Sequence, residues 1–312
     1  MKKQLLELLV CPNCLPQEHS LVADIIKQHD NDILTGALKC PHCSALFPIV
    51  DGVALLDPRT TDNQRAANKY ETEEVVSSYL WSHFSELLDD EQASQAYATW
   101  AGLIRPQAGI ALDAGGAVGR FTFEMSTKCD FAVGIDTSLA FVRAARHLMR
   151  ERSMVVPLKE EGMLRREAVI RLPDDWRSDR VEFVVANALA LPFRRKSFNI
   201  FSSLNLVDKV SSPIGHLEEM NRVTRDQAAQ FVLSDPFSWS TEAAPVEAWL
   251  GGKTDGPFTG RGLDNVATLL GEGRDTLAPA WQVGDPGHVW WKIRTHSNHY
   301  ELIRSCYVHA HR

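Results

Sequence analysis

The sequence predicts an α/β fold in which a parallel sheet carries helices on both faces, preceded by a small zinc-ribbon domain. From residue 110 onward, short apolar segments alternate with helical patterns, which is typical of a parallel sheet with crossover helices. Nearer the amino terminus, two C-x-x-C pairs have the spacing of a metal site. The chain has 312 residues, of which 44% are hydrophobic, enough for about two domains.

The composition limits the classes of substrate and partner that we expect for this chain. The formal net charge of −7 disfavours a nucleic-acid substrate and favours a small or neutral one. The first ten residues are too short for a secretory signal and contain Glu7, and no apolar run has membrane-spanning length. Four of the six cysteines stand in the two pairs, which favours metal ligation in a reducing compartment. We therefore expect a cytoplasmic protein with no membrane partner.

The two cysteine pairs predict a structural zinc site in residues 1–57. Cys11, Cys14, Cys40 and Cys43 offer four thiolates, which make a closed tetrahedral site with no open position for chemistry. The segment between the pairs is short and polar, so bound Zn²⁺ would supply stability that apolar burial does not. His42 lies inside the second pair and is expected to flank the metal.

Three segments of this ribbon resemble the zinc-ribbon activator proteins of tRNA methyltransferases: Leu5–Cys14, Cys40–Cys43 and Phe47–Leu56. The resemblance covers residues 1 to about 57. In that family the ribbon docks on a methyltransferase and shields apolar surface, which implies that this segment is a covalently attached partner. The ribbon contains four lysines and seven acidic residues. This negative charge disfavours binding of nucleic acid by the ribbon. Whether the ribbon contacts its own catalytic domain stays open.

Residues 58–104 are expected to form a linker and lid helices. The polar stretch 58–68 has no periodicity and predicts the linker. Apolar residues then recur at helical spacing from Tyr70 to Leu88, and a second helix is expected at about 91–103. These helices would cover a cofactor, although the same pattern is also that of simple amphipathic packing.

A glycine-rich turn begins the domain expected at 105–312. A strand at 109–113 ends in Asp113, and a helix is expected at about 119–127. Glycines 115, 116 and 119 lie between them, where backbone N–H groups can approach a ligand closely. The turn alone is compatible with a dinucleotide site or with a methyl-donor site.

The following strands decide between these sites. A strand at 131–135 leads into Asp136, whose carboxylate can accept hydrogen bonds from ribose hydroxyls, and a helix is expected at about 138–151. Val184–Phe193 resembles the third-strand signature of class I S-adenosylmethionine-dependent methyltransferases, in which the residue at Asn187 faces the adenine amino group. Segments 197–205 and 231–236 supply the fourth and fifth strands. The resemblance implies a Rossmann-like class I methyltransferase sheet, with Ala117 where many members carry glycine.

A narrower resemblance, over residues 68–312, is to the methyltransferase domain of ovothiol synthases, which N-methylates the imidazole of 5-thiohistidine. It rests on Tyr70–Thr72, Tyr79–Phe84, Gly116–Arg120, Asn205–Lys209, Ser212–Pro213, Ser234–Trp239, Trp249–Gly252 and Lys292–Arg294. This sequence shows no iron-dependent sulfur-inserting domain. The resemblance therefore implies a stand-alone enzyme supplied with a thiohistidine, or a relative with another small substrate.

Site residues follow from these resemblances. The residues expected to bind S-adenosylmethionine are Asp113, Gly115, Gly116, Gly119, Asp136, Asn187, Ala188 and Asn205. Those expected at the reacting atoms are Asn205, Asp208 and Tyr70. Those expected to bind the acceptor are Tyr70, Trp239, Trp249 and Arg294, as aromatic walls and a guanidinium for a carboxylate.

Three interpretations stay open. The chain is either a small-molecule methyltransferase, an RNA methyltransferase that uses the ribbon for docking, or a donor-binding partner module without catalysis. The histidines at 296, 299, 309 and 311 have no recognisable ligand spacing, so no second metal is expected. The acceptor atom and the oligomeric state are not determined by the sequence.

Overall fold

A computed structural model describes residues 1–57 and 68–312 of the chain. Its central sheet has five parallel strands in the order β9-β6-β5-β10-β11, followed by the antiparallel strand β14, which pairs with β12 and β13. The bounds are β5 Ile110–Ala114, β6 Phe131–Asp136, β9 Val181–Val185, β10 Ile200–Leu204, β11 Gln230–Asp235, β12 Gln282–Val283, β13 Gly287–His296 and β14 His299–His311. The reversal of strand order at β5 is that of a doubly wound sheet, which binds ligands at the carboxyl edge of its strands.

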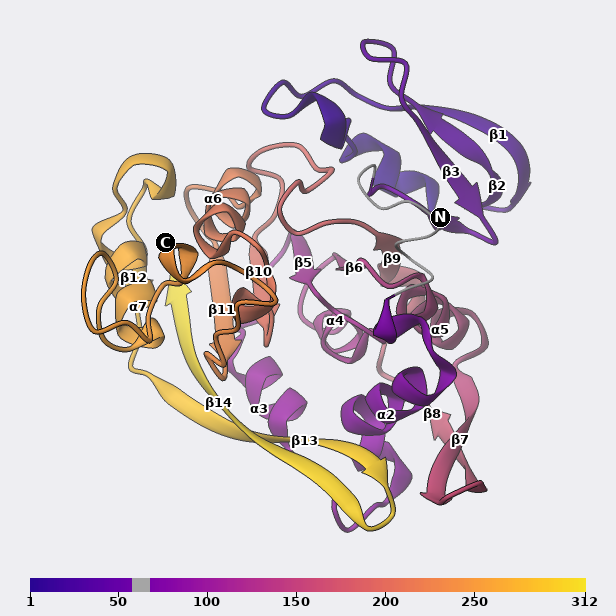
Figure 1. Cartoon of the computed structure of the whole chain (residues 1–312). Helices are drawn as coiled ribbons and strands as arrows, with labels where there is room; N and C mark the ends of the chain where they lie inside the picture. Colours follow the sequence, from indigo (N-terminus) through magenta and orange to yellow (C-terminus); the bar gives the residue numbers. More distant parts are fainter. Residues whose placement is uncertain (58–67) are drawn as a thin grey trace.

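Both faces of the sheet are covered, as the sequence predicts (Figure 1). The helices are α2 Glu73–Phe84, α3 Ala96–Leu103, α4 Arg120–Met125, α5 Leu139–Glu151, α6 Pro213–Val223 and α7 Gly262–Glu272. Successive side chains of β5 point to opposite faces of the sheet. Ala111 packs with α2–α5 on one face, and Leu112 and Ala114 pack with the ribbon, α6 and α7 on the other. The insertion at 152–180 forms a hairpin of β7 Ser153–Glu161 and β8 Leu164–Arg171.

The zinc ribbon packs on the sheet of its own chain. Its antiparallel strands are β1 Val22–His29, β2 Asp32–Lys39, β3 Leu46–Val50 and β4 Val53–Ala54. Residues 186–199, between β9 and β10, contain no helix, and the ribbon covers the sheet there, in one apolar cluster with Val184 and Ala186. Backbone hydrogen bonds join the two parts, with Leu56 N–H donating to Val185 at 2.7 Å and Val10 N–H to Pro192 at 2.9 Å. The ribbon therefore takes the place of a helical layer on this face.

A buried ion network crosses the same boundary. The Arg146 guanidinium of α5 donates to Asp32 of the ribbon at 2.8 Å and to Glu182 of β9, and Arg146 and Glu182 are almost fully buried. Their charges compensate one another, since an isolated buried charge would be strongly unfavourable. The ribbon thus contributes a carboxylate that the catalytic domain needs.

Several helix and strand boundaries differ from those expected from the sequence. The second lid helix begins at Ala96, five residues later than expected, and the third strand ends at Val185, so that Asn187 lies in the loop beyond it. Most of the expected linker, residues 58–67, lies outside the described residues. Among the described helices, none combines the length and apolarity that crossing a bilayer requires.

Candidate functional site

A cavity of about 950 Å³ opens at the carboxyl edge of the sheet. This volume lies at the upper end of the range for small-molecule sites, about 300–1,000 Å³, and has room for two ligands. Five residues expected to bind the donor line it: Gly115, Asp136, Asn187, Ala188 and Asn205. Parallel strands bring them together because their carboxyl ends meet at one edge.

Asp136 holds the glycine-rich turn. Its carboxylate accepts the Ala117 N–H at 3.1 Å and the Ser138 N–H at 2.8 Å. Burial is the main cause that raises the pKa of Asp136 to about 6. Ala117 adopts a left-handed backbone with φ of 45°, which suits glycine better than alanine. One carboxylate therefore both fixes the turn and faces the cavity.

Three other residues of the turn lie behind the cavity lining. Asp113 is buried, and its carboxylate accepts the Ser202 hydroxyl at 2.7 Å and the Thr122 hydroxyl at 2.8 Å. A Cβ at Gly116 would lie 2.8 Å from the Asp113 carboxylate, and one at Gly119 would lie 2.6 Å from the Phe183 ring. These residues shape the turn from within and are not placed to contact a ligand in the cavity.

Two asparagines of the cavity are held by hydrogen bonds. The Asn187 side-chain carbonyl accepts the Leu189 N–H at 2.9 Å, which leaves a second lone pair on the same oxygen for a ligand. The Asn205 carbonyl accepts the Ser305 hydroxyl of β14 at 2.6 Å, and its backbone has a left-handed φ of 56°. Such a strained position at a strand end is typical of functional sites.

Asp208 is buried beside the cavity and does not line it. Its carboxylate accepts the Ser238 N–H at 2.7 Å and the Lys209 ammonium at 3.1 Å, and Lys209 does line the cavity. Burial and the Asp208 carboxylate together hold the pKa of Asp235 well above its usual value. Asp208 therefore does not face the cavity itself and is linked to its lining through the Lys209 side chain.

Five aromatic residues of the cavity lining are in ring contact with one another, and we call this group the aromatic end of the cavity. Tyr70, Tyr79 and His83, before and along α2, line it with Tyr97 of α3 and Trp291 of β13. The Tyr97 hydroxyl and His83 Nε2 are hydrogen-bonded at 2.6 Å. Burial, with the Arg120 guanidinium nearby, holds the pKa of His83 well below its usual value, so the ring is neutral.

Only part of this aromatic end had a local signal in the sequence. Tyr79 and His83 are separated by one helical turn and so share a face of α2, a pattern that equally fits packing. Tyr97 and Trp291 lie on separate elements and had no such signal. Their proximity to Tyr79 depends on how α3 and the long β13–β14 hairpin pack against α2 (Figure 1).

Three residues expected to bind the acceptor do not line the main cavity. Trp239 and Trp249 stack on each other, with ring centroids 6.2 Å apart, and neither lines the cavity. Arg294 is buried, donates to Glu160 at 2.8 Å and lines a smaller neighbouring cavity. The two tryptophans pack against each other within the 236–260 loop and do not form cavity walls, because apolar rings are most stable when they are packed together.

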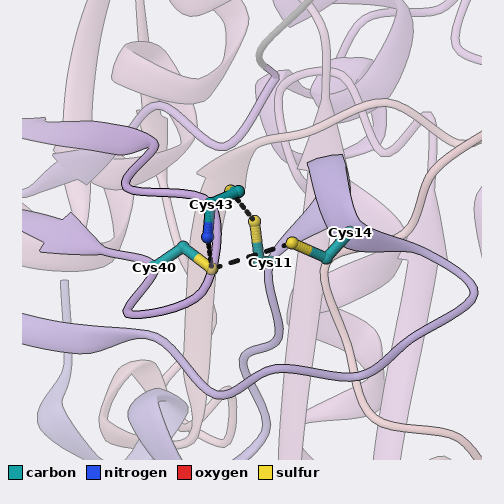
Figure 2. A group of neighbouring side chains, drawn as sticks. All are labelled: Cys11, Cys14, Cys40 and Cys43. Atoms are coloured by element: carbon teal, nitrogen blue, oxygen red, sulfur yellow. Dashed lines mark hydrogen bonds between the residues drawn. The ribbon is translucent and has the colours of Figure 1, made fainter.

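The four ribbon cysteines form one cluster (Figure 2). The Sγ atoms are 3.6 Å apart between Cys11 and Cys43 and 3.8 Å apart between Cys14 and Cys40, and all lie within 4.8 Å of one another. A tetrahedral site with Zn–S bonds of about 2.3 Å places its sulfurs about 3.8 Å apart, so the donor set fits Zn²⁺. His42 stacks on His19 beside the cluster.

Comparison with known families agrees with this geometry. Residues 2–52 match the model of the Trm112p-like protein family. Residues 112–232, which hold the glycine turn, Asp136 and Asn205, match the model of the methyltransferase domain. The chain is a methyltransferase. Its fold is that of class I S-adenosylmethionine-dependent methyltransferases, and its amino-terminal part is a Trm112p-like zinc ribbon.

Solved structures similar to this methyltransferase have low sequence identity. One, from work on the conversion of a disulfide bond into a thioacetal group during echinomycin biosynthesis, is 17% identical, with a TM-score of 0.45 and coverage of 72% of this chain and 83% of that chain. Another, from the complex between the Haloferax volcanii Trm112 methyltransferase activator and a methyltransferase, is 12% identical, with a TM-score of 0.44 and coverage of 78% and 97%. A third, Haemonchus contortus phosphoethanolamine N-methyltransferase 2 with S-adenosyl-L-methionine, is 13% identical, with a TM-score of 0.41 and coverage of 61% and 37%. No curated protein sequence matches the chain.

The left-handed backbone at Ala117 gives a stability prediction. We expect Ala117→Gly to stabilise the methyltransferase by about 0.5–1 kcal/mol, because glycine adopts this conformation without the Cβ clash that alanine suffers. Urea unfolding of both proteins measures the difference. The control is Ala140→Gly, in the regular helix α5, which we expect to destabilise by about 1 kcal/mol. Equal destabilisation by both substitutions would show that the turn is not strained.

Proposed function

We propose that the methyltransferase transfers a methyl group to a nitrogen of a small heteroaromatic acceptor, in its sharpest form the imidazole of a thiohistidine. The observation that carries this proposal is the aromatic end of the cavity, where Tyr70, Tyr79, Tyr97 and Trp291 line the same space as the expected donor residues. A flat ring packs favourably between such side chains. The ovothiol-synthase resemblance of Tyr70–Thr72 and Tyr79–Phe84 supports the same acceptor, since both segments border this end.

The donor is assigned to the part of the cavity that Gly115, Asp136, Asn187 and Ala188 line. The Asp136 carboxylate would accept hydrogen bonds from the ribose hydroxyls, Asn187 and Ala188 would hold the adenine, and Gly115 leaves room for the amino-acid end. Asn205, fixed by Ser305, also lines the cavity and would orient the methyl group. S-adenosylmethionine supplies an activated methyl group, and the protein mainly aligns it with the acceptor.

The acceptor end needs no strong base. A neutral imidazole already presents a lone pair at pH 7. His83 is neutral, and its Nδ1 has no hydrogen-bond partner among the residues that the structure describes. We infer that this nitrogen holds the acceptor ring, with Tyr97 fixing the His83 ring, while Tyr70, Tyr79 and Trp291 form the walls. Asp208 acts through Lys209 as a positioning residue.

Charge in the cavity favours a small molecule over RNA. The ionised side chains of the lining are two lysines against four carboxylates, namely Lys69, Lys209, Glu74, Asp136, Glu242 and Glu301. An RNA substrate would require a basic surface around the site, because phosphate contacts dominate its affinity. This lining and the net charge of −7 both oppose that requirement.

Calorimetry and product analysis test the proposal. Titration with S-adenosylmethionine should show binding, and mass spectrometry after incubation with 5-thiohistidine or histidine should show a singly methylated imidazole. Transfer RNA is the competing substrate, and the salt dependence of its binding is measured in parallel. Methylation of RNA with no turnover of either imidazole would overturn the small-molecule proposal, and donor binding without turnover of any of them would favour a partner module.

The assignment of His83 gives a separate prediction. We expect His83→Gln to lower kcat/KM for the acceptor about 100-fold, because the acceptor loses a positioned hydrogen bond. Tyr97→Phe keeps the ring and removes only the hydroxyl, so we expect a loss of about tenfold. Both variants should bind S-adenosylmethionine within twofold of the unmodified enzyme, which shows that they fold.

The matched control is His147→Gln, exposed on α5 and outside the cavity, which should leave the kinetics unchanged. Full activity of His83→Gln would remove His83 from the acceptor site. It would leave the assignment of the donor end untouched.

A further inference from the structure

We propose that a second, charged cavity beside the main one binds the zwitterionic end of an α-amino-acid acceptor; this inference rests on the proposed function and specifies its substrate class. The second cavity has a volume of about 290 Å³ and is enclosed by α2, the β7–β8 hairpin and the end of β13. It shares Glu74, Ser78 and Thr295 with the main cavity. One ligand can therefore occupy both.

Arg294 is the central cation of this side cavity. Its side chain is only 3% exposed, and one Nη donates to Glu160 at 2.8 Å. Its Nε has no hydrogen-bond partner among the residues that the structure describes. An unpartnered N–H of a buried guanidinium is unfavourable, and a carboxylate would satisfy it through paired hydrogen bonds. Arg294 therefore keeps hydrogen-bonding capacity that Glu160 does not use, and a ligand carboxylate in the side cavity would complement it.

The remaining charges match the rest of a zwitterion. Lys159 and Arg165 of the hairpin add positive charge next to Arg294, and Glu73 and Glu74 of α2 add negative charge on the facing wall. Lys159 forms an ion pair with Glu74, so the two signs lie close together in this cavity. A simple anion would interact only with the cations of this lining, whereas an α-amino acid offers a carboxylate for Arg294 and an ammonium for Glu73, or for Glu74 beside its ion pair with Lys159.

The arrangement along α2 connects this subsite to the methyl-transfer site. Glu74 and Ser78 are one helical turn apart and form the wall common to both cavities. Tyr79 and His83 continue along α2 into the aromatic end of the main cavity. An acceptor with its amino-acid end at Arg294 would therefore place its ring beside Tyr79 and His83.

A pair of acceptors that differ only in this end tests the subsite. 5-Thiohistidine carries the α-amino acid, whereas imidazole-4-thiol has the same ring without it. We expect the unmodified enzyme to prefer 5-thiohistidine at least 100-fold in kcat/KM. In Arg294→Gln we expect this preference to fall at least tenfold, mainly through a higher KM, with the affinity for S-adenosylmethionine unchanged. Glu74→Gln should lower the same preference by weakening the ammonium contact.

The control is Arg304→Gln, which alters an exposed arginine on β14 outside both cavities and should keep the full preference. An equal loss for the two acceptors in Arg294→Gln would assign Arg294 a structural role and overturn the subsite. An unchanged preference would overturn it as well. Turnover of neither acceptor by the unmodified enzyme, with methylation of RNA, would instead overturn the proposed function itself.

Discussion

Replacing Asp136 with alanine is expected to weaken S-adenosylmethionine binding at least about 100-fold. The carboxylate lines the cavity, and it also holds the Ala117 and Ser138 N–H groups that shape the glycine turn. Hydrogen bonds to a charged group contribute about 1.5–3 kcal/mol each, and a ribose would form two of them with this carboxylate. Isothermal titration measures the change, and Asp174→Ala, at an exposed position, is the control. Normal donor binding by Asp136→Ala would show that the ribose subsite lies elsewhere.

The same carboxylate makes donor affinity depend on pH. Burial, with a contribution from Glu71, raises the pKa of Asp136 to about 6, so the acid is protonated below pH 6 and ionised above it. The ionised form accepts both ribose hydroxyls, and the dissociation constant should therefore rise about tenfold for each pH unit below 6 and level off above it. Asp113 has a similarly raised pKa but lies behind the turn. Asp136→Asn should lose most of the dependence, and a dependence that persists would assign it to Asp113.

Loss of zinc is expected to have the largest effect on stability. Structural zinc contributes about 10–16 kcal/mol in small domains, comparable with the whole stability of a typical protein, about 5–15 kcal/mol. The ribbon here also covers Val184 and Ala186 of the sheet and supplies Asp32 to the buried Arg146. We therefore expect Cys40→Ser to unfold the ribbon, lower the melting temperature by more than 10 °C and abolish donor binding together with it.

Two controls isolate the metal. Cys306→Ser removes a thiol outside the cluster, and His42→Ala removes the ring that stacks beside it; both should retain one zinc ion per chain and melt near the unmodified protein. Zinc content is measured by atomic emission and melting by circular dichroism. A zinc-free protein that melts normally and binds S-adenosylmethionine would show that the ribbon is dispensable for the catalytic domain.

Local patterns in the sequence predicted the framework of the molecule. Strands at 110–114 and 131–136 and the helix at 139–151 lie close to where periodicity places them, because apolar spacing and burial express the same preference. The cysteine pairs predicted their own cluster, since a C-x-x-C turn aims both thiolates at one point. Asp136 and Asn187 face the cavity because parallel strands end at one edge. For these residues, a short stretch of chain and the rules of the sheet are sufficient.

Tertiary structure decided which aromatic side chains line the main cavity. Trp239, Trp249 and Arg294 looked suitable by residue type, yet two of them pack on each other and the third enters the side cavity. The main cavity is lined instead by His83, Tyr97 and Trp291, although more than 190 residues separate Tyr97 from Trp291.

The sequence by itself therefore determined the fold class, the clustering of the four ribbon cysteines and the position of Asp136 and Asn187 at one edge of the sheet, because each depends on contacts that are local or repeat along a sheet. Only the folded chain decided which aromatic side chains line the cavity and that the ribbon covers its own sheet. Those outcomes depend on long-range packing of α2, α3, the β13–β14 hairpin and the ribbon, in which each side chain's position is set by partners far away in the sequence.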